Sequence, residues 1–82
     1  MVRITIKQDG ERWQLWQFKD VGLNKGDTKL AEFCGGNMGK TLCIWAARQA
    51  ASMTFADEVH LEMEGELRSI HPAAFINGSV GA

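Results

Sequence analysis

The sequence predicts one α+β domain, an antiparallel sheet of four to five strands with one main helix packed on a face. Apolar and polar residues alternate near both ends of the chain, a turn pair separates the first two alternating segments, and a helical apolar pattern occupies the middle. A length of 82 residues suits a single domain. We expect that domain to span residues 1–76, with residues 77–82 as a flexible tail.

The N-terminal part of the chain has the pattern of a β-hairpin. Apolar and polar residues alternate from residue 2 to residue 7, and a second strand-like segment runs from about residue 12 to residue 18. Asp9-Gly10 lies between the two segments and tolerates positive φ at both centres of a type I′ turn. The two segments are therefore predicted to pair as antiparallel strands.

This turn also predicts which side chains share a face of the hairpin. With a two-residue loop at Asp-Gly, Ile6 lies opposite Trp13 and Trp16 lies opposite Arg3. Trp16 and Phe18 then point away from the face that carries Ile6. We expect these two aromatic side chains either to lie under a second layer or to form an exposed patch.

The middle of the chain predicts a loop, a strand and a helix. Residues 20–27 have loop composition, residues 28–34 alternate as a third strand, and Gly35-Gly36 interrupts the chain. A helix follows from Lys40 to about Thr54, with Asn37 or Thr41 as its cap.

Apolar residues at three- and four-residue spacing predict the buried face of this helix. The predicted face consists of Leu42, Trp45, Ala46, Ala50 and Met53. We expect it to pack on the sheet residues Ile4, Ile6, Trp13 and Leu15. Cys43 is expected to be a small core residue, and Arg48 and Gln49 are expected to face solvent.

The C-terminal third predicts a second hairpin with an acidic character. Residues 59–63 alternate as a strand, and a turn at residues 64–66 leads to a short strand that Pro72 ends. Residues 73–76 can form one helical turn. Residues 57–82 carry five acids and one base, a net charge of −4 in a chain whose total is −1. This asymmetry argues against direct contact of the C-terminal part with phosphate.

The cysteine count and the N-terminus predict a cytoplasmic protein. The N-terminal segment lacks the apolar core of a signal peptide, and no apolar run approaches the ~18 residues that cross a bilayer. Cys34 and Cys43 are the only cysteines, fewer than a small secreted domain usually carries. They could form a disulfide only if they lay close together.

The candidate chemical motifs predict no catalytic site, cofactor or metal. The segment from Gly35 to Thr41 resembles a phosphate-binding loop, but Cys34 stands where the first glycine is required. The spacing of Cys34, Cys43, His60 and His71 matches no closed zinc module. Glutamates that alternate on a strand point together into water, and nothing marks one for a raised pKa. We therefore expect a protein that is not an enzyme.

Two groups of side chains are the candidate partner-binding residues. One combines aromatic and basic character (Trp16, Phe18 and Arg3), and the other is an acidic stripe (Glu62, Glu64 and Glu66). Trp and Arg are favoured anchors of protein interfaces, which predicts a protein partner. The alternative is a nucleic-acid-binding regulator that stacks bases on the Trp/Arg hairpin. A membrane partner is not expected, and a homodimer is compatible with the sequence.

In outline, the chain resembles small uncharacterised ββαβ domains and several phage-encoded anti-CRISPR proteins. The residues that carry this resemblance extend from Val2 to about Ile70 and comprise Asp9-Gly10, Trp13, Ala46-Ala47, Ala50-Ala51 and Gly65. They are turn and packing residues, so no functional site is carried over. The resemblance implies a compact, non-enzymatic inhibitor that covers the surface of a larger partner, such as a basic nucleic-acid-binding complex.

Overall fold

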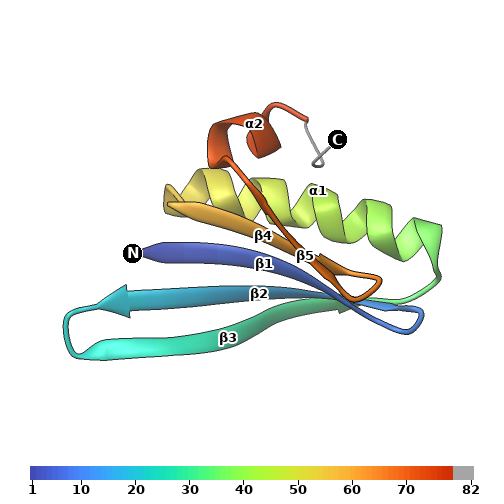
Figure 1. Cartoon of the computed structure of the whole chain (residues 1–82), viewed down its shortest axis with the longest axis horizontal. Helices are drawn as coiled ribbons and strands as arrows, with labels where there is room; N and C mark the ends of the chain where they lie inside the picture. Colours follow the sequence, from blue (N-terminus) through green and yellow to red (C-terminus); the bar gives the residue numbers. More distant parts are fainter. Residues whose placement is uncertain (79–82) are drawn as a thin grey trace.

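A computed structural model describes residues 1–78 of the chain (Figure 1). In chain order its elements are β1 (Val2–Asp9), β2 (Arg12–Val21), β3 (Asn24–Phe33), α1 (Asn37–Thr54), β4 (Glu58–Met63), β5 (Glu66–Ile70) and α2 (Pro72–Ile76). Of the predicted flexible tail, residues 79–82 lie outside the described part. Asn77 and Gly78 donate backbone hydrogen bonds to the carbonyl oxygens of Ala73 and Phe75.

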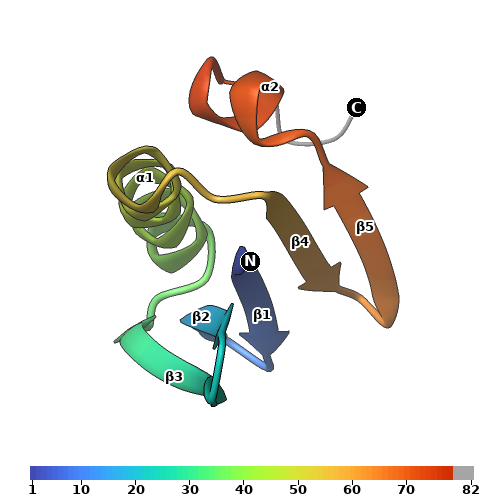
Figure 2. The same cartoon turned by 90° about the vertical axis from the view of Figure 1, so that its left-hand side faces the viewer.

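The described strands form one five-stranded sheet in the order β3-β2-β1-β4-β5, and this confirms the predicted α+β class. The prediction of an antiparallel sheet needs one correction. β1 and β4 run parallel, while the other neighbouring strands are antiparallel. A parallel pair requires a long crossover, which β2, β3 and α1 together provide. Both helices lie on the same side of the sheet, and no described element covers the other side (Figure 2).

The β1–β2 hairpin forms as predicted, but its pairing differs from the predicted one. Asp9 pairs with Arg12, so the two loop residues are Gly10 and Glu11 and not Asp9-Gly10. Gly10 takes the positive φ of 63°, and glycine at the first central position is the preference of a type II′ turn. Ile6 therefore lies opposite Leu15. The faces do not change, because the partner of each residue shifts by two positions and side chains alternate with a period of two.

The region predicted to be a loop, residues 20–27, is instead the end of a long β2–β3 hairpin. Val21 pairs with Asn24, and Gly22 with a φ of 62° forms the turn together with Leu23. This end of the hairpin extends beyond α1 in Figure 1. β3 lies at the edge of the sheet, and nearly all of its side chains are exposed. The segment at residues 20–27 therefore carries polar residues on both faces and lacks the alternation from which a strand is predicted.

Helix α1 begins at Asn37, three residues before the predicted start. Its N-cap residue is Gly36, with a φ of 58°, and no side chain caps the helix. Asn37 and Thr41 are therefore not caps. The Thr41 hydroxyl donates a hydrogen bond to the Asn37 carbonyl oxygen inside the helix. The positive φ of Gly36 gives the chain the sharp entry that an N-cap side chain was expected to stabilise.

The face of α1 that packs on the sheet differs from the predicted one, of which Ala46 and Ala50 alone pack against the core as half-buried residues. The buried residues of the helix are Gly39, Cys43, Ile44, Ala47 and Ala51. Leu42, Trp45 and Met53 were predicted to be core but are exposed. Small residues at i, i+4 spacing allow the helix backbone to approach the sheet closely. The helix therefore packs on the sheet through these residues and leaves its larger apolar side chains exposed. The prediction of Cys43 as a core residue is confirmed.

One hydrophobic core lies between the sheet and the two helices. Besides the buried face of α1, its residues are Ile4, Ile6, Trp13, Leu15, Ala56, Val59, Leu61, Ile70 and Phe75. Phe75 is fully buried and attaches α2 to this core. Arg48 was expected to face solvent but is half-buried, because its guanidinium donates hydrogen bonds to the carbonyl oxygens of Phe75 and Gly78.

Candidate functional site

The candidate site is the face of the sheet opposite the helices, which we call the open face. Strand alternation places Arg3, Thr5 and Lys7 of β1 on it, beside Gln14, Trp16 and Phe18 of β2 and Glu58, His60 and Glu62 of β4. Their alternate neighbours, such as Ile4 and Leu15, fill the core. The open face therefore combines two large aromatic rings with cations and carboxylates.

Two cation–aromatic pairs lie side by side on β1 and β2. The Arg3 guanidinium carbon is 4.7 Å from the centre of the Phe18 ring, and the Lys7 ammonium nitrogen is 4.9 Å from the Trp16 ring. Such contacts stabilise by about 0.5–1 kcal/mol at exposed sites. They also answer the question left open by the sequence. Trp16 and Phe18 are half-buried without a second layer, because the cationic side chains from the neighbouring strand lie against them.

A chain of hydrogen bonds fixes the orientation of the Trp16 ring. Its indole Nε1 donates to Oε1 of Gln14 at 2.9 Å, and Nε2 of Gln14 donates to Oε1 of Glu32 at 3.1 Å. Glu32 also pairs with Lys29 at 3.9 Å. The polar edge of the ring is thus bonded within the protein.

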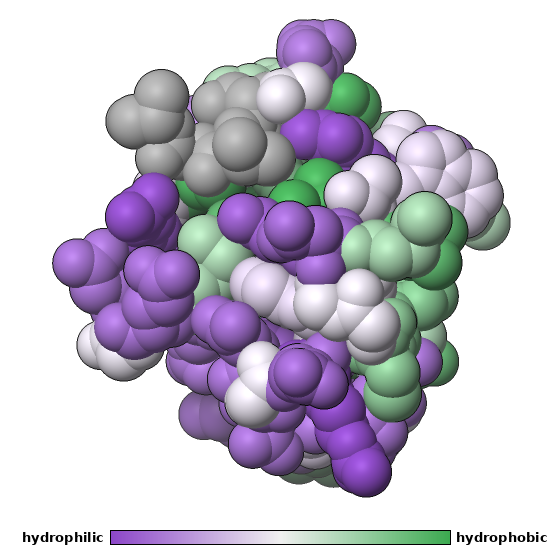
Figure 3. All heavy atoms as spheres, turned by 90° about the vertical axis from the view of Figure 1, so that its right-hand side faces the viewer, coloured by the Kyte–Doolittle hydropathy of each residue, from purple (hydrophilic) through white to green (hydrophobic). Residues whose placement is uncertain are grey.

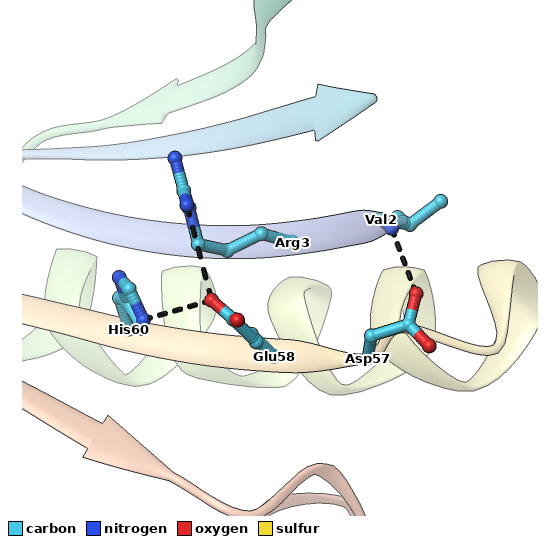
Figure 4. A network of polar contacts seen from close by, with 5 residues as sticks. All are labelled: Val2, Arg3, Asp57, Glu58 and His60. Carbon is cyan, nitrogen blue, oxygen red and sulfur yellow. Dashed lines mark hydrogen bonds and ion pairs between the residues drawn. The ribbon is translucent and has the colours of Figure 1, made fainter. Parts of the chain in front are cut away.

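The β4 side of the open face carries a polar cluster around Glu58. Oε2 of Glu58 lies 3.8 Å from the Arg3 guanidinium and 3.3 Å from Nε2 of His60, as Figure 4 shows. At the end of the same strand pair, Val2 N donates to Oδ2 of Asp57 at 2.9 Å, and Asp57 N donates to Val2 O at 2.8 Å. Arg3 therefore bridges the aromatic pair of β1–β2 and the carboxylate of β4.

The structure brings one predicted group of partner-binding residues together on the open face and places the other around the β4–β5 turn. Arg3, Trp16 and Phe18 lie together on the open face, where Arg3 pairs with Phe18 and Thr5 with Trp16. Correct placement of the turn at Gly10-Glu11 would have predicted these pairs from the sequence. Lys7 was not singled out as a candidate partner-binding residue, although the same register places it on the strand beside Trp16.

The three glutamates do not form the single stripe predicted from their alternation. Glu62 lies on the open face, near the end of β4. Glu64 lies in the β4–β5 turn with a φ of 52°, and Glu66 is the first residue of β5, opposite Met63. Glu66 also pairs with Arg68 at 3.1 Å. The strand ends one residue before Glu64, so the alternation stops there. The three glutamates instead line an open pocket of about 340 Å³ at this turn, together with Gln8, Met63, Gly65 and Leu67.

The residues weighed as metal ligands or nucleophiles lie apart from one another in the described part of the chain. Cys34 is exposed before α1, and Cys43 is buried within it, both as free thiols. Nδ1 of His71 accepts a hydrogen bond from Ala73 N and caps α2. Burial raises the pKa of Cys43 to about 11, which keeps this thiol protonated and unreactive at neutral pH. No three His, Cys, Asp or Glu side chains within residues 1–78 converge as a metal site.

The geometry of the open face suits binding by contact. A cationic side chain lies over each of its two aromatic rings, and carboxylates lie beside these cations on the neighbouring strand. Neither described helix is long and apolar enough to span a membrane. In comparisons with known proteins, no protein family, no curated protein and no solved structure matched this chain.

Proposed function

We propose that this protein is a non-enzymatic binding domain that recognises a protein partner through its open face. The observation that carries the proposal is the pair of cation–aromatic contacts, Arg3 with Phe18 and Lys7 with Trp16, on a side of the sheet that no described element covers. Trp and Arg are the residue types that most often dominate binding energy in protein interfaces. Rings that are already oriented lose little conformational entropy on binding.

The charges of the open face favour a protein over a nucleic acid. Glu58 and Glu62 lie beside Arg3 and Lys7 on the neighbouring strands, and Glu32 lies beside Gln14. A surface that tracks phosphates requires uncompensated cations, because phosphate contacts supply most of the affinity. Here carboxylates accompany the cations, an arrangement that suits a partner surface with charges of both signs.

We extend the proposal to the mode of action and the compartment. A domain of 82 residues acts by covering the surface of a larger partner, as the resemblance to anti-CRISPR proteins implies. The acidic residues around the β4–β5 turn suit a basic region of that partner. The two free thiols suit the reducing cytoplasm. The phage origin and the bacterial defence complex stay predictions, since the comparisons bear on neither.

The test compares two variants that remove an exposed or half-exposed apolar side chain at different places. Trp16→Ala changes the open face, whereas Leu23→Ala changes the fully exposed end of the β2–β3 hairpin. Tagged wild type and both variants are used to capture proteins from a cytoplasmic extract of the source organism. Binding kinetics of the purified candidate are then measured. We expect Trp16→Ala to weaken binding by roughly 30-fold or more, mainly through faster dissociation, and Leu23→Ala to bind like wild type.

Two controls make this test decisive. Far-UV circular dichroism and urea unfolding verify that Trp16→Ala is folded, and Lys7→Ala serves as a second open-face variant if it is not. Labelled single-stranded DNA and RNA oligonucleotides are titrated in parallel. Submicromolar oligonucleotide binding that weakens steeply with salt, and that Lys7→Ala reduces, would contradict the proposal and support the nucleic-acid alternative.

A further inference from the structure

A second surface, distinct from the open face, runs along the outer side of α1. It consists of Met38, Leu42, Trp45, Gln49 and Met53, and we call it the helix stripe. Its apolar members are 68%, 44%, 63% and 80% exposed in that order. Figure 3 shows hydrophobic and near-neutral side chains gathered along the side of the molecule on which α1 lies. The spacing of four, three, four and four residues keeps the stripe on one line of the helix surface.

The exposed area of the stripe matches what a small stable interface needs. Taking about 200 Å² for a fully exposed large side chain, these fractions leave on the order of 500 Å² of apolar surface. Monomeric proteins seldom expose a larger continuous patch. If apolar atoms form about 60–65% of the buried surface, the stripe implies an interface of roughly 800 Å² on each partner, the standard size.

The charge pattern of α1 identifies a second copy of the chain as the occupant. The helix carries only two charged side chains, and both point away from the stripe. Lys40 lies over the Trp13 ring at 5.8 Å, and Arg48 is bonded to carbonyl oxygens of the α2 region. An interface between two identical surfaces places the same charge pattern on both sides, so a surface patch with charges of one sign would repel its own copy. An uncharged stripe avoids this repulsion, whereas a partner of strong charge would have nothing on it to pair with.

The order of the residues also fits two-fold symmetry. Trp45 lies at the middle of the stripe, with Met38 near one end and Met53 near the other. A two-fold axis close to Trp45 therefore places methionine near methionine and leaves the tryptophans at the centre. A large aromatic anchor at the centre of an apolar patch is the usual place of an interface hot spot. We propose that the protein forms a homodimer through the helix stripe, with Trp45 as its central contact.

The test measures molar mass by light scattering and sedimentation equilibrium between about 1 and 200 µM, a range that brackets weak and moderate dimers. We expect wild type to reach twice the 9.1 kDa chain mass. Trp45→Glu should raise the dissociation constant by roughly 30-fold or more. Leu23→Glu places the same charge on another fully exposed apolar residue and should leave the dimer unchanged.

Each alternative outcome is informative. A wild type that stays at 9.1 kDa throughout overturns the proposal and leaves the stripe for a different protein. A dimer that Trp45→Glu does not weaken places the interface elsewhere and overturns it too. If Trp45→Glu is unfolded by circular dichroism, the double variant Leu42→Gln/Met53→Gln takes its place with the same expected result.

Discussion

Replacement of Gly39 by Ala tests the close approach of α1 to the loop before it. Gly39 is buried in the first turns of the helix, where alanine would ordinarily be the better residue by about 0.8–1 kcal/mol. A Cβ atom at this position would meet the backbone of Cys34, at 2.7 Å from its carbonyl oxygen and 2.9 Å from its carbonyl carbon. The structure therefore predicts that this substitution destabilises the fold.

The size of the effect follows from these distances. Favourable contacts between heavy atoms lie near 3.5–4.0 Å, so the Cys34 backbone would have to move by roughly 0.7 Å or more. Two backbone hydrogen bonds tie the loop to the first turn of the helix and resist this movement, from Met38 N to Gly35 O and from Lys40 N to Gly36 O. Overpacking of this kind costs about 1–3 kcal/mol. After the gain in helix propensity, we expect a net loss of about 1–2 kcal/mol in the free energy of unfolding.

Urea unfolding followed by circular dichroism and tryptophan fluorescence measures this loss. Gly26→Ala is the matched control, since Gly26 lies in β3 with open space around its Cβ position. It should be neutral or stabilise the fold by about 0.5–1 kcal/mol. If Gly39→Ala unfolds at the same urea concentration as wild type, the inference that the Cys34 backbone leaves no space for a Cβ atom at residue 39 is wrong.

Three further predictions concern single side chains. Phe75→Ala should lower the free energy of unfolding by about 3–5 kcal/mol because Phe75 is fully buried. Trp45→Ala should lower it by less than about 1 kcal/mol at concentrations where the chain is monomeric, because Trp45 is exposed. Urea midpoints that ranked the two variants in the reverse order would refute the core assignment. A thiol reagent at pH 8 should label one cysteine per folded chain, Cys34, and both in urea. Burial raises the pKa of Cys43 from 9.0 to about 11, so between these pH values unfolding releases the proton of its thiol. The free energy of unfolding should therefore fall by roughly 1.4 kcal/mol per pH unit as the pH rises from 9 toward 11, and Cys43→Ala should remove that slope. Phe55→Gly should stabilise the monomer by about 0.5–1 kcal/mol, because Phe55 ends α1 with a φ of 51° and an exposed ring; an equal or lower urea midpoint would contradict this.

The sequence predicted the elements well and their three-dimensional relations less well. Strict alternation identified β1 and β4, because one side of each strand is buried and the other is not. The pattern could not show that β1 and β4 run parallel, since pairing between residues 55 positions apart leaves no local trace. It also placed the turn one residue early, because Asp9-Gly10 and Gly10-Glu11 both satisfy turn chemistry and preserve the same faces.

The largest error concerned the helix, and its cause is physical. The predicted face followed the apolar spacing through Leu42, Trp45 and Met53, and these large residues of α1 define an exposed face of their own. The sheet instead receives the small residues, because Gly39, Cys43, Ala47 and Ala51 allow the helix to lie close. A helix with two apolar faces can pack on the sheet through either of them, and the sequence alone does not say which face meets the sheet. For the candidate site, the aromatic and basic residues were identified, but the contact between Lys7 and Trp16 needed the correct register.

The central position of β1 has a consequence for the order in which this protein can fold. β1 can pair with β2 as soon as both have been synthesised, but its other edge waits for β4, more than fifty residues later. Until then β1 is an unpaired edge strand, the kind of surface that recruits other chains. Pairing of β4 with β1 closes a long loop, and the entropy lost in closing it makes this step slow. The core is complete only after this step, because β4 contributes core residues. A nascent or truncated chain that ends before residue 58 would therefore have to keep this edge from aggregating by other means, and α1, made just before β4, is the only described helix available to shield it.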